Sequence, residues 1–254
     1  MRFASLGSGS EGNGLVVESG STRVLIDCGF GVRDAASRLA RLGLEPGALA
    51  AILVTHEHTD HVGGVPAFAA RHGIAVWGSF GTLAAASHRF EAMEGVRAFD
   101  SHAAFAVGDL EITPVPVPHD AREPTQFVLS DGAVRLGVLT DIGVSTPHVE
   151  ECLSGCAALV LETNHCPDML AESDYPYPLK QRIAGRLGHL ANGDAAGLLQ
   201  RIDTSRLKHV VAAHLSKQNN TSVKARFALA GALNCTEDWI GVASQAEGFG
   251  WRDL

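Results

Sequence analysis

One ten-residue stretch, Thr55-His56-Glu57-His58-Thr59-Asp60-His61-Val62-Gly63-Gly64, is the most informative part of the chain. It places three histidines and two acidic residues within six positions, directly after an apolar run at residues 51–54 that predicts a short buried strand. In a loop leaving that strand, His56 and His58 can point the same way, while Asp60 and His61 face a second position. Imidazole and carboxylate ligands suit zinc, iron or manganese. The stretch therefore predicts a loop that serves two adjacent metal ions.

Three further ligand candidates stand at the ends of other apolar runs. One loop cannot fill two coordination spheres, so the remaining ligands must come from elsewhere, from positions that a strand holds rigidly. His119 follows residues 115–118, Asp141 follows the run at 137–140, and His214 follows the run at 210–213. Asp141 could bridge the two metal ions.

The pattern of strands and helices predicts two sheets packed together. Turn residues Gly20-Ser21 and Asp131-Gly132 each join two β-rich runs, which is typical of antiparallel hairpins. Strand runs are expected at 16–19, 22–26, 51–54, 74–77, 110–117, 126–130, 134–139, 158–161 and 209–213, and helices at 33–42, 66–72, 82–88, 179–187, 195–202 and 223–233. We expect one domain over residues 1–254, an α/β sandwich with helices on its outer faces. A doubly wound parallel sheet is the alternative, but the hairpins require antiparallel pairs.

Composition excludes several classes of protein. With 46% hydrophobic and 19% charged residues, the 254-residue chain is typical of a globular protein rather than a disordered or fibrous one. Its five cysteines are scattered and include no Cys-x-x-Cys pair, so neither a disulfide framework nor a zinc ribbon is expected. The N-terminus lacks the apolar core of a signal peptide, and no membrane partner is expected, so we expect a cytoplasmic location.

Charge is distributed unevenly along the chain. The formal net charge is −8, yet residues 178–226 hold nine Lys or Arg against two acidic residues. Such an asymmetry can mark a polyanionic partner, although solvated helix faces explain it equally well.

The order His56-x-His58-x-Asp60-His61, then His119, Asp141 and His214, resembles the metallo-β-lactamase superfamily along nearly the whole chain. The resemblance implies an αββα four-layer sandwich. It also implies a first metal ion on His56, His58 and His119, a second on Asp60, His61 and His214, and Asp141 between them. Asp27 matches an early structural aspartate of the family, expected to orient the histidine loop.

A dinuclear site of this kind predicts a hydrolase. A hydroxide held between two divalent ions, whether zinc, manganese or iron, can attack an electrophile at neutral pH, and two ions can stabilise a phosphoryl centre. The same site could hydrolyse a thioester, a lactone or a β-lactam. The catalytic candidates are Asp60, Asp141, His165 and His189, the two histidines being hypothesised to protonate the leaving oxygen or to clamp a phosphate.

Segments outside the ligands favour nucleic acid, DNA in particular, as the substrate. The stretches at 7–13, 162–165, 175–180, 188–192 and 214–220 resemble the YycJ/WalJ branch of the superfamily, which implies DNA exonuclease activity, although Ala191 stands where that branch often has serine. Neutral donors and lysines there suit phosphate oxygens. The candidate substrate-binding residues are Ser10, Asn13, Lys180, Ser216, Lys217, Asn219 and Asn220.

Two other functions stay open at this point. A small-molecule phosphodiesterase or a thioesterase resembling glyoxalase II fits the same fold and the acidic net charge. A di-iron redox or binding protein is the other alternative, and the chain shows no flavodoxin-like partner domain to support it.

Overall fold

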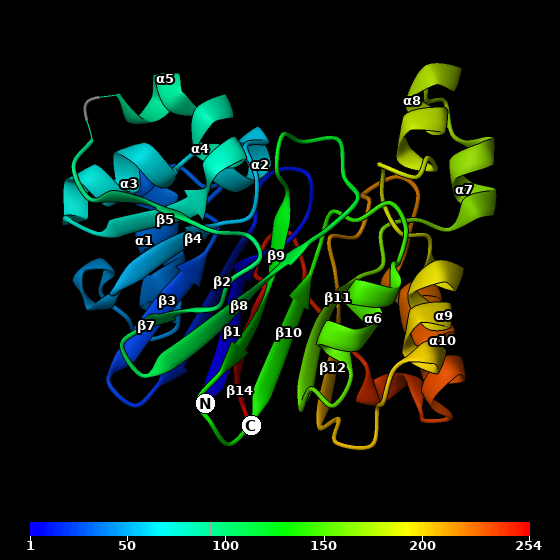
Figure 1. Cartoon of the computed structure of the whole chain (residues 1–254). Coiled ribbons are helices and arrows are strands. Elements are labelled where there is room, and N and C mark those ends of the chain that lie inside the picture. Colours follow the sequence, from blue (N-terminus) through cyan, green and yellow to red (C-terminus); the bar gives the residue numbers. More distant parts are fainter. Residues whose placement is uncertain (92) are drawn as a thin grey trace.

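The computed structural model of the chain describes residues 1–91 and 93–254, and these form two seven-stranded mixed sheets (Figure 1). The first sheet contains, from edge to edge, β14 (Phe249–Asp253), β1 (Arg2–Gly7), β2 (Gly14–Ser19), β3 (Thr22–Ile26), β4 (Ala51–Val54), β5 (Ala75–Ser79) and β6 (Val96–Phe99). The second contains, in the corresponding order, β13 (Gly241–Val242), β12 (His209–Ala213), β11 (Ala158–Glu162), β10 (Arg135–Leu139), β9 (Thr125–Ser130), β8 (Leu110–Pro116) and β7 (Phe105–Val107).

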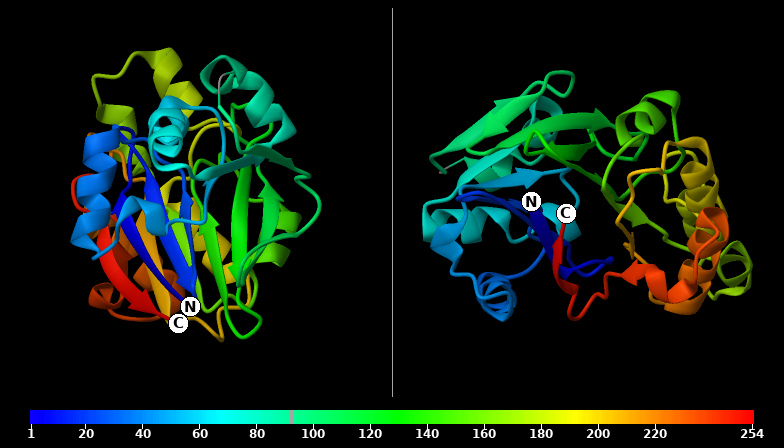
Figure 2. Two further views of the ribbon diagram at one scale, coloured as in Figure 1. Left: turned by 90° about the vertical axis from the view of Figure 1, so that its left-hand side faces the viewer. Right: turned by 90° about the horizontal axis from the view of Figure 1, so that it is seen from below.

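Helices cover the outer faces of both sheets, and the view from below shows the resulting layers (Figure 2). The helices on the side of the first sheet are α1 (Val32–Arg41), α3 (Val65–His72), α4 (Phe80–Ala85) and α5 (Ser87–Phe90). Those on the side of the second are α6 (Pro147–Leu153), α9 (Asn192–Arg201) and α10 (Ser222–Leu233). The remaining helices lie at the end of the sandwich opposite to the termini and are α2 (Thr59–Val62), α7 (Pro167–Glu172) and α8 (Tyr177–Ile183). This arrangement confirms the predicted αββα sandwich.

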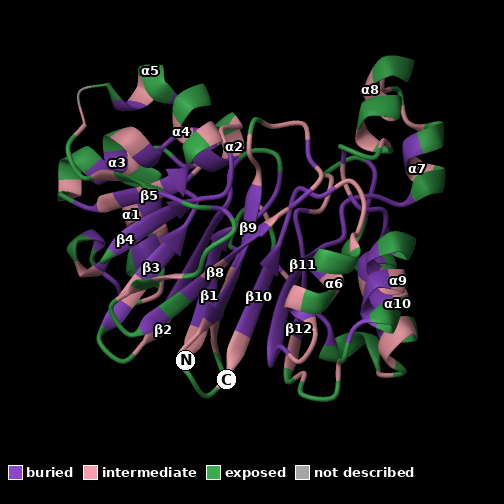
Figure 3. Ribbon diagram, viewed as in Figure 1, coloured by how far each residue is buried: buried purple, intermediate pink, exposed green. Residues whose placement is uncertain are grey.

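The side chains of the central strands alternate between the two faces of each sheet. They therefore contribute to three apolar layers, one between the sheets and one under the helices on each side. In β4, Ala51 and Leu53 join the core between the sheets, whereas Ile52 and Val54 pack under the helices of the first sheet. Successive side chains of a strand point to opposite faces, so a strand covered on both sides must be apolar throughout. Figure 3 shows these strands as buried along most of their length.

The sequence-based boundaries are correct for the central strands and less so at the periphery. The strands at 22–26, 51–54 and 209–213 have the predicted limits. The helix expected at 179–187 is wrong in its limits, because α8 begins at Tyr177, where proline suits the first turn, and ends at Ile183. The helix expected at 82–88 is two short helices, α4 and α5, separated at Ala86. The first begins earlier than expected because Ser79 caps it by accepting a hydrogen bond from the Thr82 N–H group.

The topology brings polar residues from distant parts of the chain to one edge. Strands β3 and β4 are parallel, as are β10, β11 and β12, and β8 runs in the same direction as β10 because both are antiparallel to β9. Residues just beyond the carboxyl ends of these strands therefore meet at the end that carries α2 (Figure 1). Among the described residues, no helix is long and apolar enough to cross a membrane.

Phe127 tests the core between the sheets. It is fully buried on β9 and packs edge-to-face on Phe99, with ring centroids 5.8 Å apart. We expect Phe127→Ala to lower the free energy of unfolding by about 3–5 kcal/mol in a denaturant titration. Phe227→Ala is the matched control, because Phe227 is 70% exposed on α10, and should change stability by less than about 0.5 kcal/mol. Equal effects of the two substitutions would contradict this assignment of the core.

Candidate metal centre

The histidine loop leaves β4 and turns at once into α2, whose first turn carries Asp60 and His61. His56, His58 and His119 offer ligand atoms within 4.8 Å of one another, and so do Asp60, His61 and His214. Asp141 lies between the two groups, because it also forms such a set with His56 and His61. The structure thus brings the seven ligand candidates together, and Asp141 and His214 also form such a set with Glu162 and His189.

Short distances connect the members of the two sets. Nε2 of His61 lies 3.0 Å from Oδ2 of Asp141 and 3.4 Å from Oδ2 of Asp60. Nε2 of His214 lies 3.4 Å from the same Asp60 oxygen and 3.5 Å from Oδ1 of Asp141. In the other set, Nε2 of His119 lies 3.3 Å from Nδ1 of His58.

Hydrogen bonds from Nδ1, the ring nitrogen on the side away from the cluster, orient three of the buried imidazoles. Thr55 donates its hydroxyl proton to Asp27 (2.8 Å), so its oxygen accepts from Nδ1 of His56 at 2.9 Å. Nδ1 of His61 donates to Asp27 (2.7 Å). Nδ1 of His119 donates to the carbonyl oxygen of Gly188 (3.0 Å). Each bond leaves Nε2 free of its proton and facing the cluster, which is the usual arrangement around metal-binding histidines.

Burial and charge set the protonation of the ligands. Burial, followed by the neighbouring His61, holds the pKa of His56 well below its usual value, and burial also lowers the pKa of His119. For Asp141, burial opposes ionisation, but His214 and His61 outweigh it and hold the pKa well below its usual value. Without a metal ion, His56 and His119 are therefore neutral and Asp141 is ionised, the forms that coordinate metals. Asp141 and the other nearby carboxylates outweigh burial and raise the pKa of His61 well above its usual value and that of His214 to about 10, so these two imidazoles must release a proton when a metal ion binds.

Backbone strain is concentrated at the same place. Asp27, Asp141 and His214 have φ angles of 59°, 53° and 53°, in the left-handed region that residues other than glycine rarely adopt. They account for three of the four such residues in the described part of the chain. Strain of this kind costs about 1–3 kcal/mol per residue and is found mainly at functional sites.

The donor set fits a pair of divalent metal ions. His56 is 0% exposed, and its Nε2 has no hydrogen-bond partner among residues 1–91 and 93–254. An unpaired buried nitrogen is costly unless something binds to it. Histidine and carboxylate ligands without a cysteine cluster suit zinc, manganese or iron.

His189 joins the cluster, whereas His165 lies in a different environment. Nδ1 of His189 donates to Oε1 of Glu162 at 2.7 Å, and its ring centroid lies 5.4 Å from that of His119 and 5.3 Å from that of His214. Burial alone would lower the pKa of His189, but Glu162 and Asp141 raise it above its usual value. His165 is 2% exposed and contributes to an apolar hollow beside α7 and α8.

The seven predicted substrate-binding residues divide into exposed and buried groups. Lys180 donates to the carbonyl oxygen of Ala171 (2.6 Å), and Lys217 pairs with Glu11 (2.5 Å), with both partners more than half exposed. Ser10 is exposed. The hydroxyl of Ser216 accepts from the backbone N–H of Asn219 at 3.2 Å, and both side-chain polar atoms of the buried Asn219 lack a partner among the described residues.

Asn13 and Asn220 make internal hydrogen bonds that tie loops together. Asn220 donates to Oδ1 of Asn192 (2.8 Å) and to the carbonyl oxygen of Thr163 (2.8 Å). Asn13 accepts from Ser8 (3.1 Å), and its Nδ2 lies 3.1 Å from Nε2 of His61. These contacts favour a supporting position for both asparagines.

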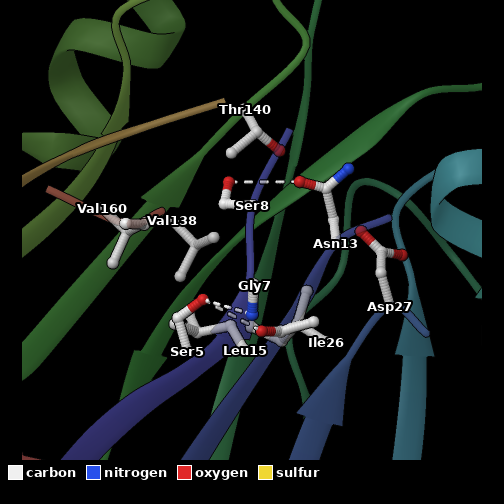
Figure 4. A pocket seen from close by; sticks show the side chains of 12 residues that line it. Ser5, Gly7, Ser8, Asn13, Leu15, Ile26, Asp27, Val138, Thr140 and Val160 are labelled. Atoms are coloured by element: carbon white, nitrogen blue, oxygen red, sulfur yellow. Dashed lines mark hydrogen bonds between the residues drawn. The ribbon is translucent and has the colours of Figure 1, made fainter. Parts of the chain in front are cut away.

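A small cavity of about 30 Å³ lies next to Asn13, Ser8 and Asp27. Figure 4 shows Ser8 and Asn13 joined by a hydrogen bond, with Thr140 and Asp27 nearby and Val138 and Val160 on the apolar side. The lining is mostly apolar, and Ser8, Asn13, Asp27 and Thr140 contribute its polar side chains. The cavity thus lies between polar residues next to the ligand candidates, such as Asn13 and Asp27, and apolar residues of the core between the sheets, such as Val138 and Val160.

The sequence pattern singled out the segment 162–165 but indicated no individual role for Glu162 or Asn164, and none for Thr55. Glu162 is fully buried at the end of β11, and its Oε1 lies 3.4 Å from Nδ1 of His214. Asn164 donates to the carbonyl oxygen of His214 (2.9 Å). The sequence does contain a signal for Glu162. This residue stands at the end of an apolar strand, and the same kind of position identified His119, Asp141 and His214 as ligand candidates.

Comparison with known proteins assigns the chain to a family. The family model of the β-lactamase superfamily domain matches residues 22–214. Exodeoxyribonuclease YycJ of Bacillus anthracis is 32% identical over 253 residues, covering 97% of this chain and 94% of that protein. Exodeoxyribonuclease WalJ of Streptococcus pneumoniae is 30% identical over 252 residues, covering 95% and 91%. The crystal structure of the metallo-β-lactamase fold protein YhfI from Bacillus subtilis has the same fold, with a TM-score of 0.75 at 15% identity over 99% of both chains. The chain therefore belongs to the β-lactamase superfamily, in the branch of its YycJ and WalJ relatives.

Proposed function

We propose that this protein is a metal-dependent phosphodiesterase that removes nucleotides from an end of DNA. The observation that carries the proposal is the pair of ligand sets at the strand ends, each with atoms within 4.8 Å, together with Asp141, which forms a further such set with one member of each, His56 and His61. Its relatives YycJ and WalJ, which match along nearly their whole length, are exodeoxyribonucleases. A cytoplasmic location fits this activity and stays a prediction.

In this proposal, His56, His58 and His119 would hold one divalent ion, Asp60, His61 and His214 would hold the other, and Asp141 would be available to both. Two such ions would supply a water nucleophile at neutral pH and neutralise charge on a phosphate. Glu162 keeps His189 oriented through the 2.7 Å bond, so the second ring nitrogen of His189 can deliver a proton to the leaving oxygen. The carboxylate of Glu162 would stabilise the protonated ring that this step requires, through the same hydrogen bond.

Positive charge on α8 and the adjoining loop suits a polyanion. Lys180, Arg182 and Arg186 lie on α8 or just beyond its end, and Arg182 pairs with Asp120 at 2.5 Å. Asp120 follows the ligand His119 and has Oδ1 3.4 Å from Nε2 of that residue. The cationic helix is thus tied to the ligand cluster, as expected for contacts with the phosphates of a strand whose end is at the metal centre.

Hydrolysis of end-labelled DNA tests the proposal. We expect protein reconstituted with Mn²⁺, Zn²⁺ or Fe²⁺ to release nucleotides from one end. Asp60→Ala should reduce the rate at least about 100-fold, because even residues that only hydrogen-bond to metal ligands contribute about 10–100-fold to activity. Asp238→Ala, at an exposed position in the turn Glu237–Trp239, is the control and should retain full activity. A protein inactive on single- and double-stranded DNA but active on a thioester would instead be a thioesterase of the same fold.

His189→Asn tests the proton donor. Asparagine can keep the hydrogen bond to Glu162 while it removes the second ring nitrogen, so turnover should fall about 10²–10⁴-fold at unchanged metal content. His148→Asn, on the exposed side of α6, should match the wild type in both measurements. Loss of metal from His189→Asn would make His189 a ligand instead, and unchanged turnover would remove it from the reaction.

A further inference from the structure

A hollow of about 400 Å³ lies between α7, α8 and the segment that carries His165. Its lining is mostly apolar and includes His165, Pro167, Leu170, Tyr177, Lys180 and Gln181. The volume is within the range of sites that enclose small organic groups. The metal centre as described above uses none of these side chains as a ligand.

The walls of the hollow are suited to a flat ring. Tyr177 stands at the edge of the hollow and is 70% exposed, and its hydroxyl accepts a hydrogen bond from Nε2 of Gln181 at 2.8 Å, which restricts the ring. On the α7 side lie the apolar Pro167 and Leu170. His165 is 2% exposed, and its Nδ1 has no hydrogen-bond partner in the described part of the chain. An exposed aromatic ring above an apolar floor is what base stacking uses.

Two segments of the chain connect the lining of the hollow to the metal centre. His165 follows Asn164, whose side chain donates to the carbonyl oxygen of the ligand His214 at 2.9 Å. On the other side, α8 carries both Tyr177 and Arg182, and Arg182 pairs with Asp120, the neighbour of the ligand His119. A group bound in the hollow therefore lies against the same segments that position two metal ligands.

The positive charge of Lys180 and Arg182 indicates what kind of molecule the hollow binds. Lys180 lines the hollow, and Arg182 lies on the same helix, so an apolar ring attached to an anion is favoured over an uncharged apolar group. Lys180 donates to the carbonyl oxygen of Ala171 at 2.6 Å, which ties α8 to α7 across the hollow and keeps its charge there. A nucleotide combines the flat ring and the anion in one molecule.

We propose that this hollow binds one unstacked nucleobase, the base of the nucleotide whose phosphate is held at the metal centre. The inference rests on the proposed function and adds a base-binding subsite to it. A base can enter only after it leaves the duplex stack, so ends that are single-stranded or frayed should be the better substrates.

Calorimetric titration of the metal-loaded protein tests the subsite directly. We expect deoxyadenosine monophosphate to bind about 5- to 150-fold more tightly than 2-deoxyribose 5-phosphate, the effect of one stacked base. Tyr177→Ala should remove most of that advantage, and Tyr177→Phe should keep it. Ala171→Trp, at an exposed position that lines the hollow, should fill the space and also abolish the advantage.

Tyr175→Ala provides a matched control, because the chain contains two tyrosines and Tyr175 is not in the lining of the hollow. This variant should bind the nucleotide as the wild type does. Equal binding of the nucleotide and the sugar phosphate by the wild type would overturn the inference. Nucleotide binding unaffected by both Tyr177→Ala and Ala171→Trp would overturn it as well.

A substrate without a nucleobase separates the inference from the proposed function. If the wild type hydrolyses bis(4-nitrophenyl) phosphate and DNA but shows no preference for the nucleotide in the titration, only the subsite is wrong. If it hydrolyses neither compound with any metal, the proposed phosphodiesterase activity is wrong. In that second case the titration still decides whether the hollow binds a base.

Discussion

The carboxylate of Asp27 is the constraint on which the rest of the site depends. It accepts hydrogen bonds from the backbone N–H of Thr55 (2.8 Å), the Thr55 hydroxyl (2.8 Å) and Nδ1 of His61 (2.7 Å). These three bonds fix the start of the histidine loop to the end of the neighbouring strand. The hydroxyl oxygen of Thr55 then orients His56, so one buried carboxylate sets the direction of a ligand in each of the two sets.

The same design is repeated across the sandwich. Each sheet contributes parallel strands that end at one edge, and a residue one or two positions beyond such a strand can adopt a left-handed conformation that directs its side chain to the cluster. Asp27 does so in the first sheet, and Asp141 and His214 do so in the second. On that side Glu162 accepts from Nδ1 of His214, as Asp27 does from His61, and Asn164 donates to the carbonyl oxygen of His214. The apolar core between the sheets keeps the two halves in place.

The sequence predicted the fold class and identified ligand candidates that the fold gathers in one place, because both leave local signals. Runs of apolar residues mark the buried strands, and histidines at short spacing mark the loop. Supporting residues leave weaker signals: Glu162 and Thr55 are single polar residues whose importance comes from contacts across the sheet. The hollow beside α8 was not predictable, since its walls come from two short helices whose limits depend on prolines and on tertiary contacts.

Metal binding by Asp27→Asn tests the account most directly. Asparagine keeps the acceptor for the Thr55 N–H and tolerates the left-handed backbone, but its amide group faces Nδ1 of His61 with a donor. His61 must then carry its proton on Nε2, where it can no longer bind a metal ion. The account predicts two ions per wild-type chain by elemental analysis and an affinity about 10- to 100-fold weaker for one of them in the variant. A variant that holds two ions with wild-type affinity would contradict it.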